Sequence, residues 1–348
     1  MSPLVAAVAG ARQPLERSTL LRSLGLVLLG AIILYLVSGA LGDYDRLQLA
    51  TGAYYFAALA GLTVLIGWSG QISLGHGALM AVGAYTVALL IGDNDWSVLP
   101  ALVAAVVVSC AVAAPLGAAA SRLRGPYLAG ATLAVAVGLP ALADRFPSAF
   151  GGSNGLTINP PTPPSWLGAN FSLEHWEAWI ACAGALVVLF VLYNLTHSGV
   201  GRSLRAVRDD EIAASLCGLR IGRLQTLTFV ISGGCAGLAG ALLALALQLA
   251  QPDAFPLELS LSLLTGVVLG GLGSLTGAIW GAAVLVLLPS WTNDIASSLS
   301  LSQNVGDNLP FAIYGVVLIA AMLVWPSGIQ GGFMALRRLM STQRRKAG

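Results

Sequence analysis

Ten long apolar runs constrain the fold of this chain more than any other feature of its sequence. A helix needs about 20 mostly apolar residues to cross a bilayer, whereas the strands of a membrane β-barrel alternate over about 10 residues. These runs are continuous and rich in Leu, Ala and Val, so they predict membrane-spanning helices. The runs are 24–41, 47–66, 78–92, 97–120, 127–143, 177–196, 225–250, 258–273, 275–290 and 309–325.

The low content of charged side chains supports the same prediction. Charged residues make up 9% of the chain and hydrophobic residues 57%, whereas soluble domains contain about 25% charged residues. We therefore expect an all-α integral membrane protein with about ten transmembrane helices. The composition excludes a disordered chain, a secreted disulfide scaffold and a nucleic-acid binder. No C-x-x-C pair occurs among the cysteines, which are expected to be free thiols: Cys110, Cys182, Cys217 and Cys235.

Charge placement predicts the orientation in the membrane. Fifteen of the 17 basic residues lie before the first run, after the fourth and sixth runs, and in the C-terminal tail, while the other connections hold 11 of the 15 acidic residues. Basic loops stay cytoplasmic, so we expect a cell (inner) membrane protein with both termini inside. The expected parts are a cytoplasmic segment 1–23, a membrane domain 24–325 with a cytoplasmic loop 197–224, and a cytoplasmic basic tail 326–348.

Two Gly-rich segments interrupt the apolar runs at matching places. Both ends of 258–290 should be outside, but its 33 residues give about 50 Å of helix where two full spans need about 60 Å. We therefore expect short or broken helices that turn at Gly270–Ser274, and a similar break at 67–77. Runs one to four align with runs seven to ten, which predicts two pseudo-related halves. Such breaks are typical of a transport path, although close helix packing by small residues is an equal alternative.

The expected spans lack the groups that power or catalyse reactions in membranes. Away from their ends they contain no Asp, Glu, Lys or Arg, whereas proton- and ion-driven transporters usually need such residues. The three histidines are far apart in sequence, and no metal-ligand spacing occurs. A P-loop is missing too, since the only lysine, Lys346, lies in the tail. We expect no enzyme and no metal site, and any energy for transport must come from another subunit.

The cytoplasmic loop 197–224 is the most informative polar segment. We expect one short helix over Ser203–Leu216, with Leu204, Val207, Ile212 and Leu216 on roughly one side and Gly218 ending it. Such a helix suits either docking to a cytoplasmic protein or lying on the lipid surface. The acidic residues at 209–211 favour a protein partner over an anionic membrane.

Several motifs in this chain, taken in order, resemble those of one transporter family. The segments that carry the resemblance are Gly70–Gly77, Gly83–Tyr85, Leu123–Tyr127, Thr132–Leu133, Gly151–Gly155, Gly201–Gly218, Ala236–Ala241, Val268–Ser274 and Trp325–Gly328. They are similar to the motifs of branched-chain amino acid ABC importer permeases of the LivM type. The resemblance covers about residues 47–332. The stretch Ala134–Ala141 is more apolar than in many relatives, and urea and short-amide permeases share the same motifs.

The resemblance implies a permease subunit without cofactors of its own. A second homologous permease, two cytoplasmic subunits that bind ATP and Mg, and an external substrate-binding protein would complete the importer. The implied substrate path includes Gly70, Gln71, Ser73, Gly75, His76, Tyr127, Thr132, Gly270, Gly271, Gly273 and Ser274. The implied coupling residues are Arg205, Arg208, Asp209, Asp210, Glu211, Ala213, Ala214 and Gly218, with Ala213 and Ala214 entering a groove of the ATPase.

Two alternatives stay open at this stage. His76 is either a hydrogen-bonded packing residue or part of the path. A stand-alone channel for a small polar solute explains the apolar spans, but it leaves the charged loop helix without a role. A membrane enzyme is disfavoured because the spans offer no acid, base or metal ligands.

Overall fold

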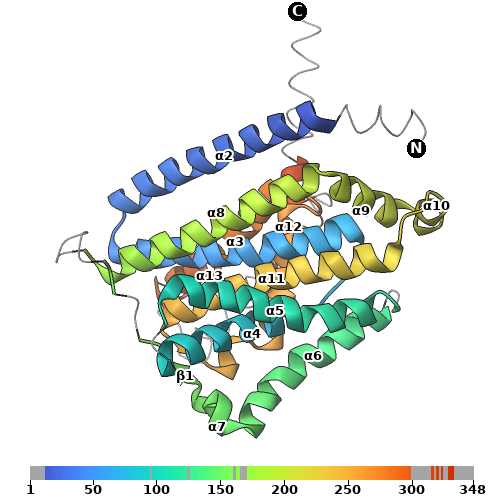
Figure 1. Ribbon diagram of the computed structural model, residues 1–348. Coiled ribbons are helices and arrows are strands. Elements are labelled where there is room, and N and C mark those ends of the chain that lie inside the picture. Colours follow the sequence, from blue (N-terminus) through green and yellow to red (C-terminus); the bar gives the residue numbers. More distant parts are fainter. Residues whose placement is uncertain are drawn as a thin grey trace, which may run out of the picture.

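The computed structural model describes residues 12–94, 96–123, 126–159, 162–164, 171–298, 315–316, 319–320, 323 and 328–332. Almost all of this part of the chain is helical, and the long helices lie side by side in a bundle (Figure 1). The all-α prediction is therefore confirmed.

The membrane helices follow the predicted apolar runs closely. Their bounds are α2 Arg12–Ala40, α3 Asp43–Ser69, α4 His76–Ala88, α5 Val98–Ala120, α6 Pro126–Arg145, α8 Leu173–His197, α11 Ile221–Leu247, α12 Leu257–Gly270 and α13 Leu275–Ser298. Seven helices of the described part are long and apolar enough to cross a membrane. Two shorter apolar helical stretches lie at 76–92, which begins with α4, and at 275–291, within α13. Most of the tenth run, 309–325, lies outside the described residues.

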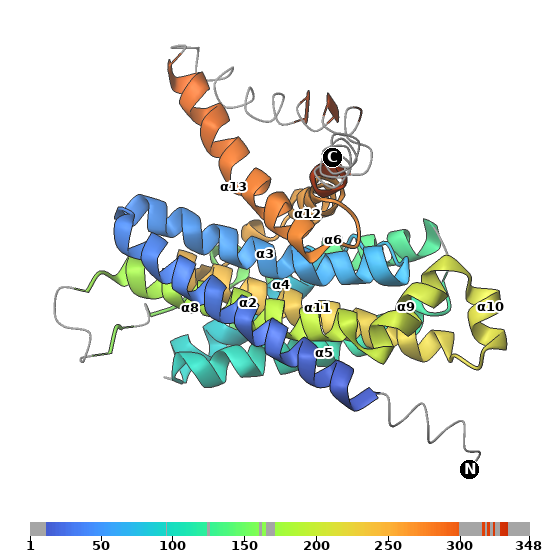
Figure 2. The same cartoon turned by 90° about the horizontal axis from the view of Figure 1, so that it is seen from above.

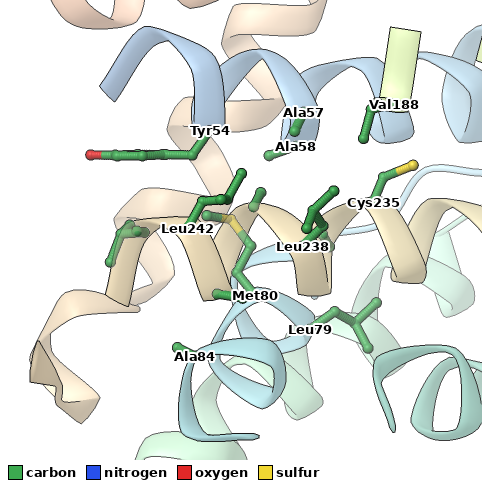
Figure 3. Close-up of a cluster of buried hydrophobic side chains, with 14 of the residues drawn as sticks. Tyr54, Ala57, Ala58, Leu79, Met80, Ala84, Val188, Cys235, Leu238 and Leu242 are labelled. Carbon is green, nitrogen blue, oxygen red and sulfur yellow. The ribbon is translucent and has the colours of Figure 1, made fainter. Parts of the chain in front are cut away.

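Helix α11 is the centre of the bundle and packs against α3, α4 and α5. Figure 3 shows side chains of α3, α4, α8 and α11 meeting in one apolar cluster around it. Glycines let α4 approach α11 closely, since a Cβ on Gly83 would collide with the carbonyl of Gly237 and one on Gly240 with the carbonyl of Met80. Small residues at such crossings are the usual means of helix association in membranes.

Helix α2 lies at the edge of the bundle beside α8 (Figure 1), and α13 projects from the bundle (Figure 2). Helix α2 packs mainly on α8, where the Ser23 hydroxyl donates to Asn194 Oδ1 at 3.1 Å and the Trp179 indole donates to Ser38 Oγ at 3.0 Å. Many of its large apolar side chains are exposed, as Leu28 is at 62%. Such a surface is unfavourable in water and favourable in lipid.

A short antiparallel pair, β1 (Leu156–Thr157) with β2 (Leu249–Ala250), joins two connections at the end of the bundle opposite α9 (Gly199–Asp209). The predicted run 225–250 is therefore too long: α11 stops at Leu247, and Gln248 turns the chain in the left-handed region at φ 56°. The connection from α6 to β1 contains α7 (Pro147–Phe150) and the 3-10 turn η2 (Gly152–Asn154). A second 3-10 turn, η4 (Pro252–Ala254), leads into α12, and a π-helical turn, η1 (Leu89–Asp93), extends α4.

The segment between α8 and α11 forms two helices where the sequence predicts one. These are α9 (Gly199–Asp209) and α10 (Glu211–Leu216). The prediction is wrong because Asp210 adopts an extended conformation and its carboxylate caps α10, accepting from the amides of Ile212 (2.8 Å) and Ala213 (3.0 Å). Asp side chains favour caps over helix interiors for this reason.

The predicted end of this segment at Gly218 is confirmed. Gly218 has φ 82°, its amide donates to the Ser215 carbonyl at 2.9 Å, and the Leu219 amide donates to the Ala214 carbonyl at 3.1 Å. This pair of bonds is the Schellman motif, which needs a left-handed residue after the last turn.

Candidate translocation and coupling sites

The two Gly-rich breaks predicted from the sequence lie against each other. Helix α3 ends at Ser69 and α4 starts at His76, while α12 ends at Gly270 and α13 starts at Leu275. The Trp68 indole N–H donates to the Gly273 carbonyl at 2.8 Å, across 205 residues of sequence. A Cβ on Gly67 would collide with the backbone of Gly273. Both breaks are confirmed as interruptions between helices, and their contact was not predicted.

Glycine is required at the turn between α12 and α13. Gly271 has φ 118° and Gly273 has φ 80°, a region that side chains with a Cβ rarely adopt. Gly328 packs its backbone on Gly271, because a Cβ there would lie 2.5 Å from the Gly271 Cα. The last motif of the sequence therefore meets this turn.

The other residues of this turn have structural contacts. A Cβ on Gly270 would collide with the Gly277 carbonyl. Ser274 Oγ lies 2.8 Å from Thr276 Oγ1 and accepts from the Gly277 amide at 3.3 Å. Gly270 therefore permits close approach of α12 and α13, and Ser274 caps the first turn of α13.

Helices α6 and α12 support the break before α4. Thr132 of α6 is 5% exposed, and its hydroxyl accepts from the Leu74 amide at 2.9 Å. Gly75 leaves room for this approach, since a Cβ there would lie 2.8 Å from the Thr132 carbonyl. On the other side, Ser260 Oγ of α12 accepts from the Gly77 amide at 3.0 Å. Ser260 belongs to none of the sequence motifs, and its role at this break was not predicted.

Tyr127 does not join this site. It lies in the first turn of α6, and its side chain is 77% exposed. Thr132 reaches the break and Tyr127 does not, although the sequence grouped the two residues in one motif.

Three polar residues of the first break are buried: Gln71, Ser73 and His76. The imidazole Nε2 of His76 lies 3.1 Å from the Ala58 carbonyl, so Nε2 carries the proton and donates. His76 Nδ1 and Gln71 Nε2 are among the buried polar atoms of the described residues that have no hydrogen-bond partner. Such atoms are uncommon in proteins and mark places where water or a solute can bind.

Two of the predicted coupling residues, Arg205 and Arg208, contact the C-terminal end of α3. Arg208 Nη1 donates to the Gly67 carbonyl at 2.6 Å, while its Nε and Nη2 donate to Asp209 Oδ1 at 2.9 and 2.7 Å. The Arg205 guanidinium carbon lies 3.9 Å from the ring centroid of Trp68. A cation near the last carbonyls of a helix is favourable because those groups carry partial negative charge.

The residues of the predicted docking face differ in burial. Leu204 and Val207 are buried in the bundle, but Ile212 and Leu216 are 75% and 84% exposed. Ala214 is 4% exposed and faces its own chain, so it is not part of the exposed surface of α10. Ala213 is exposed, and Glu211 Oε1 accepts from Gln225 Nε2 at 3.0 Å.

A cavity of about 520 Å³ lies among α2, α3, α8 and α13. Its lining is apolar apart from Asp45 and Gln48, and Gln48 Nε2 donates to Ser290 Oγ at 3.3 Å. The residues of the two breaks do not line it. Its chemistry suits hydrocarbon and not a polar solute.

Comparison with known proteins identifies the family. The family described as "Branched-chain amino acid transport system / permease component" matches residues 44–325. The chain belongs to this permease family. The match starts at α3, so α2 lies outside the matched residues.

Individual permeases of this family align with most of the chain. LivM of Salmonella typhimurium is 32% identical over 296 residues, which cover 77% of this chain and 66% of that relative, just under two thirds of its length. LivH of Escherichia coli is 28% identical over 293 residues, covering 80% and 92%. The ribose import permease RbsC of Escherichia coli is 28% identical over 271 residues, covering 76% and 79%. No solved structure matches the chain.

Proposed function

We propose that this chain is the transmembrane permease subunit of an ABC importer for branched-chain or related amino acids. It works with a second homologous permease, two cytoplasmic subunits that bind ATP and Mg and hydrolyse the ATP, and an external substrate-binding protein. The permease lies in the cell (inner) membrane with both termini in the cytoplasm. The names of the LivM and LivH relatives support the substrate class, and the match to both supports pairing with a homologous permease.

The exposed apolar face of α10 is the observation that carries this proposal. Ile212 and Leu216 stand out from a charged segment between α8 and α11, with side chains 75% and 84% exposed. The segment projects at one end of the bundle (Figure 1). Short amphipathic helices of this kind dock in grooves of protein partners. A stand-alone channel has no need for such a surface.

The polar groups of the first break suit a zwitterionic substrate. Gln71 offers an unpartnered amide nitrogen and His76 an unpartnered ring nitrogen, whereas the Gln71 amide oxygen accepts from the Ser69 hydroxyl at 3.2 Å. Neutral groups can bind an ammonium and a carboxylate without adding a fixed charge to the path. In this proposal the binding protein selects the substrate and the permease lets it through.

Uptake by cells that carry or lack this chain tests the substrate class. We expect deletion of the chain to abolish high-affinity uptake of labelled leucine, isoleucine or valine, and expression of the chain to restore it. Competition with unlabelled urea, acetamide and ribose separates the alternatives. If deletion of the chain leaves leucine uptake unchanged and abolishes uptake of labelled urea or acetamide, the importer serves short amides.

A further inference from the structure

Three elements that are distant in sequence meet at the inner end of α3. Helix α9 contributes Arg205, whose guanidinium lies over the face of Trp68 at 3.9 Å. The edge of the same indole donates to the Gly273 carbonyl in the α12–α13 turn at 2.8 Å. Trp68 is 8% exposed, so its ring is fixed between the cytoplasmic segment and the turn.

A second contact runs parallel to the first. Arg208 of α9 donates to the Gly67 carbonyl at 2.6 Å, and the Gly67 backbone packs directly on the backbone of Gly273. Because neither glycine has a side chain, no flexible group separates the two backbones. Displacement of α9 therefore moves the end of α3 and the turn together.

Arg205 is also tied to the helix before it. Its Nη2 donates to the Thr196 carbonyl, in the last turn of α8, at 3.0 Å. Arg202, three residues earlier on α9, donates to the His197 carbonyl at 3.4 Å, and the cation–π contact of Trp68 in the described part of the chain is with Arg205. The two arginines make similar backbone contacts, and Arg205 adds the cation–π contact with α3.

We infer that Arg205 and Trp68 form the mechanical link through which movement of α9 repositions the α12–α13 turn during the transport cycle. This link rests on the proposed function, because α9 adjoins α10, the surface assigned to the ATP-hydrolysing partner. The cation over the ring face and the indole N–H at its edge couple two elements through one rigid side chain. Arg205 and Trp68 are positioning residues in this link.

A thiol in the turn reports its position. Leu272 lies between Gly271 and Gly273 and is 55% exposed, so Leu272→Cys places a reporter there. Cys217→Ser removes the exposed native thiol. The assembled complex is purified in nanodiscs, and the rate of reaction with a small maleimide is measured with and without a non-hydrolysable ATP analogue. We expect the analogue to change the rate in this parent by about twofold to tenfold. This range corresponds to the net free energy of one hydrogen bond.

Substitutions at the link should remove this response. Trp68→Phe keeps the ring under Arg205 but loses the N–H donor, and Arg205→Gln loses the cation. In both variants we expect the rate ratio to fall clearly towards one while the ATPases stay bound, because only the Arg208–Gly67 contact is left, and to fall less in Arg205→Lys. Arg205 is exposed, so its variants also serve if Trp68→Phe fails to fold.

Matched controls exist on the same chain. Trp179→Phe removes an indole hydrogen bond of the same kind, to Ser38, and Arg202→Gln removes a charge from the same helix. Both should keep the parent ratio. The link is overturned if the parent with bound ATPases shows no response, or if Trp68→Phe and Arg205→Gln respond as the parent does. Failure of any ATPase to co-purify would instead contradict the proposed function, and the link with it.

Discussion

Gly67 lies where the last turn of α3 touches the α12–α13 turn. A Cβ there would collide with the backbone nitrogen and Cα of Gly273, and backbone atoms cannot move aside as a flexible side chain can. We expect Gly67→Ala to lower the free energy of unfolding by about 1–3 kcal/mol and to reduce uptake, measured by thermal unfolding in detergent and by transport.

Gly52 provides the matched control for Gly67 within the same helix. No atom lies within 4 Å of a Cβ built on Gly52. Since alanine forms helix better than glycine, Gly52→Ala should leave stability unchanged or raise it by up to about 1 kcal/mol. Equal stability of Gly67→Ala and Gly52→Ala would refute the close approach of α3 to the turn.

Asp210 determines the start of α10. Its carboxylate accepts from two backbone amides at 2.8 and 3.0 Å, so Asp210→Ala should cost about 0.5–2 kcal/mol and Asp210→Asn much less. Hydrogen exchange of the α10 amides measures the effect. We expect faster exchange in Asp210→Ala, and unchanged exchange would mean that the cap does not hold the helix.

At the scale of elements, α10 offers separate tests of surface and core. The double change Ile212→Ser and Leu216→Ser alters side chains that are 75% and 84% exposed, so the permease should stay folded while recovery of the ATPases on co-purification falls severalfold. Ala206→Ser, at an exposed site of α9, should have no effect. Full recovery of the ATPases with the double variant would place their contact elsewhere.

Ala214→Trp should act through stability and not directly on docking. Ala214 is 4% exposed against its own chain, and an inserted indole overpacks that contact by about 1–3 kcal/mol. We expect a lower thermal unfolding temperature of the permease even without its partners. Unchanged stability combined with lost ATPase stimulation would favour the docking role expected from sequence.

The positions of the helices could be predicted from hydropathy, because a helix that spans lipid needs a long apolar run however it packs on its neighbours. The end of α11 was missed because Leu249 and Ala250 are as apolar as the helix, although they pair as a strand with residues 156–157. The split at Asp210 was missed because its cap competes locally with the helix. Such side-chain contacts carry little signal in periodicity.

The candidate site was predictable in its parts and not in its assembly. Glycine clusters marked both breaks, since only glycine tolerates the φ values found at 271 and 273. The contact of Trp68 with Gly273 joins residues 205 positions apart and depends on tertiary packing. The roles of these residues in transport and coupling remain predictions.

At the scale of the whole molecule, native Cys217 tests the orientation. Cys217 is exposed, whereas Cys182 and Cys235 are buried, so an impermeant maleimide should label Cys217 in inside-out vesicles and not in intact cells. Ser153→Cys, in an exposed turn near β1, should show the opposite pattern in a Cys217→Ser background. Labelling of Cys217 from outside intact cells would contradict the predicted topology and indicate the opposite orientation.

ATP-dependent uptake into proteoliposomes tests the central claim most directly. The chain is reconstituted with its sister permease and the two ATPases, and uptake of labelled leucine is followed with the binding protein outside and ATP inside. We predict that uptake stops when this chain, ATP or the binding protein is omitted, because in the proposed importer the ATPases supply the energy and the binding protein delivers the substrate. Equal leucine uptake by this chain alone, without ATP, would contradict the account and make the protein a channel.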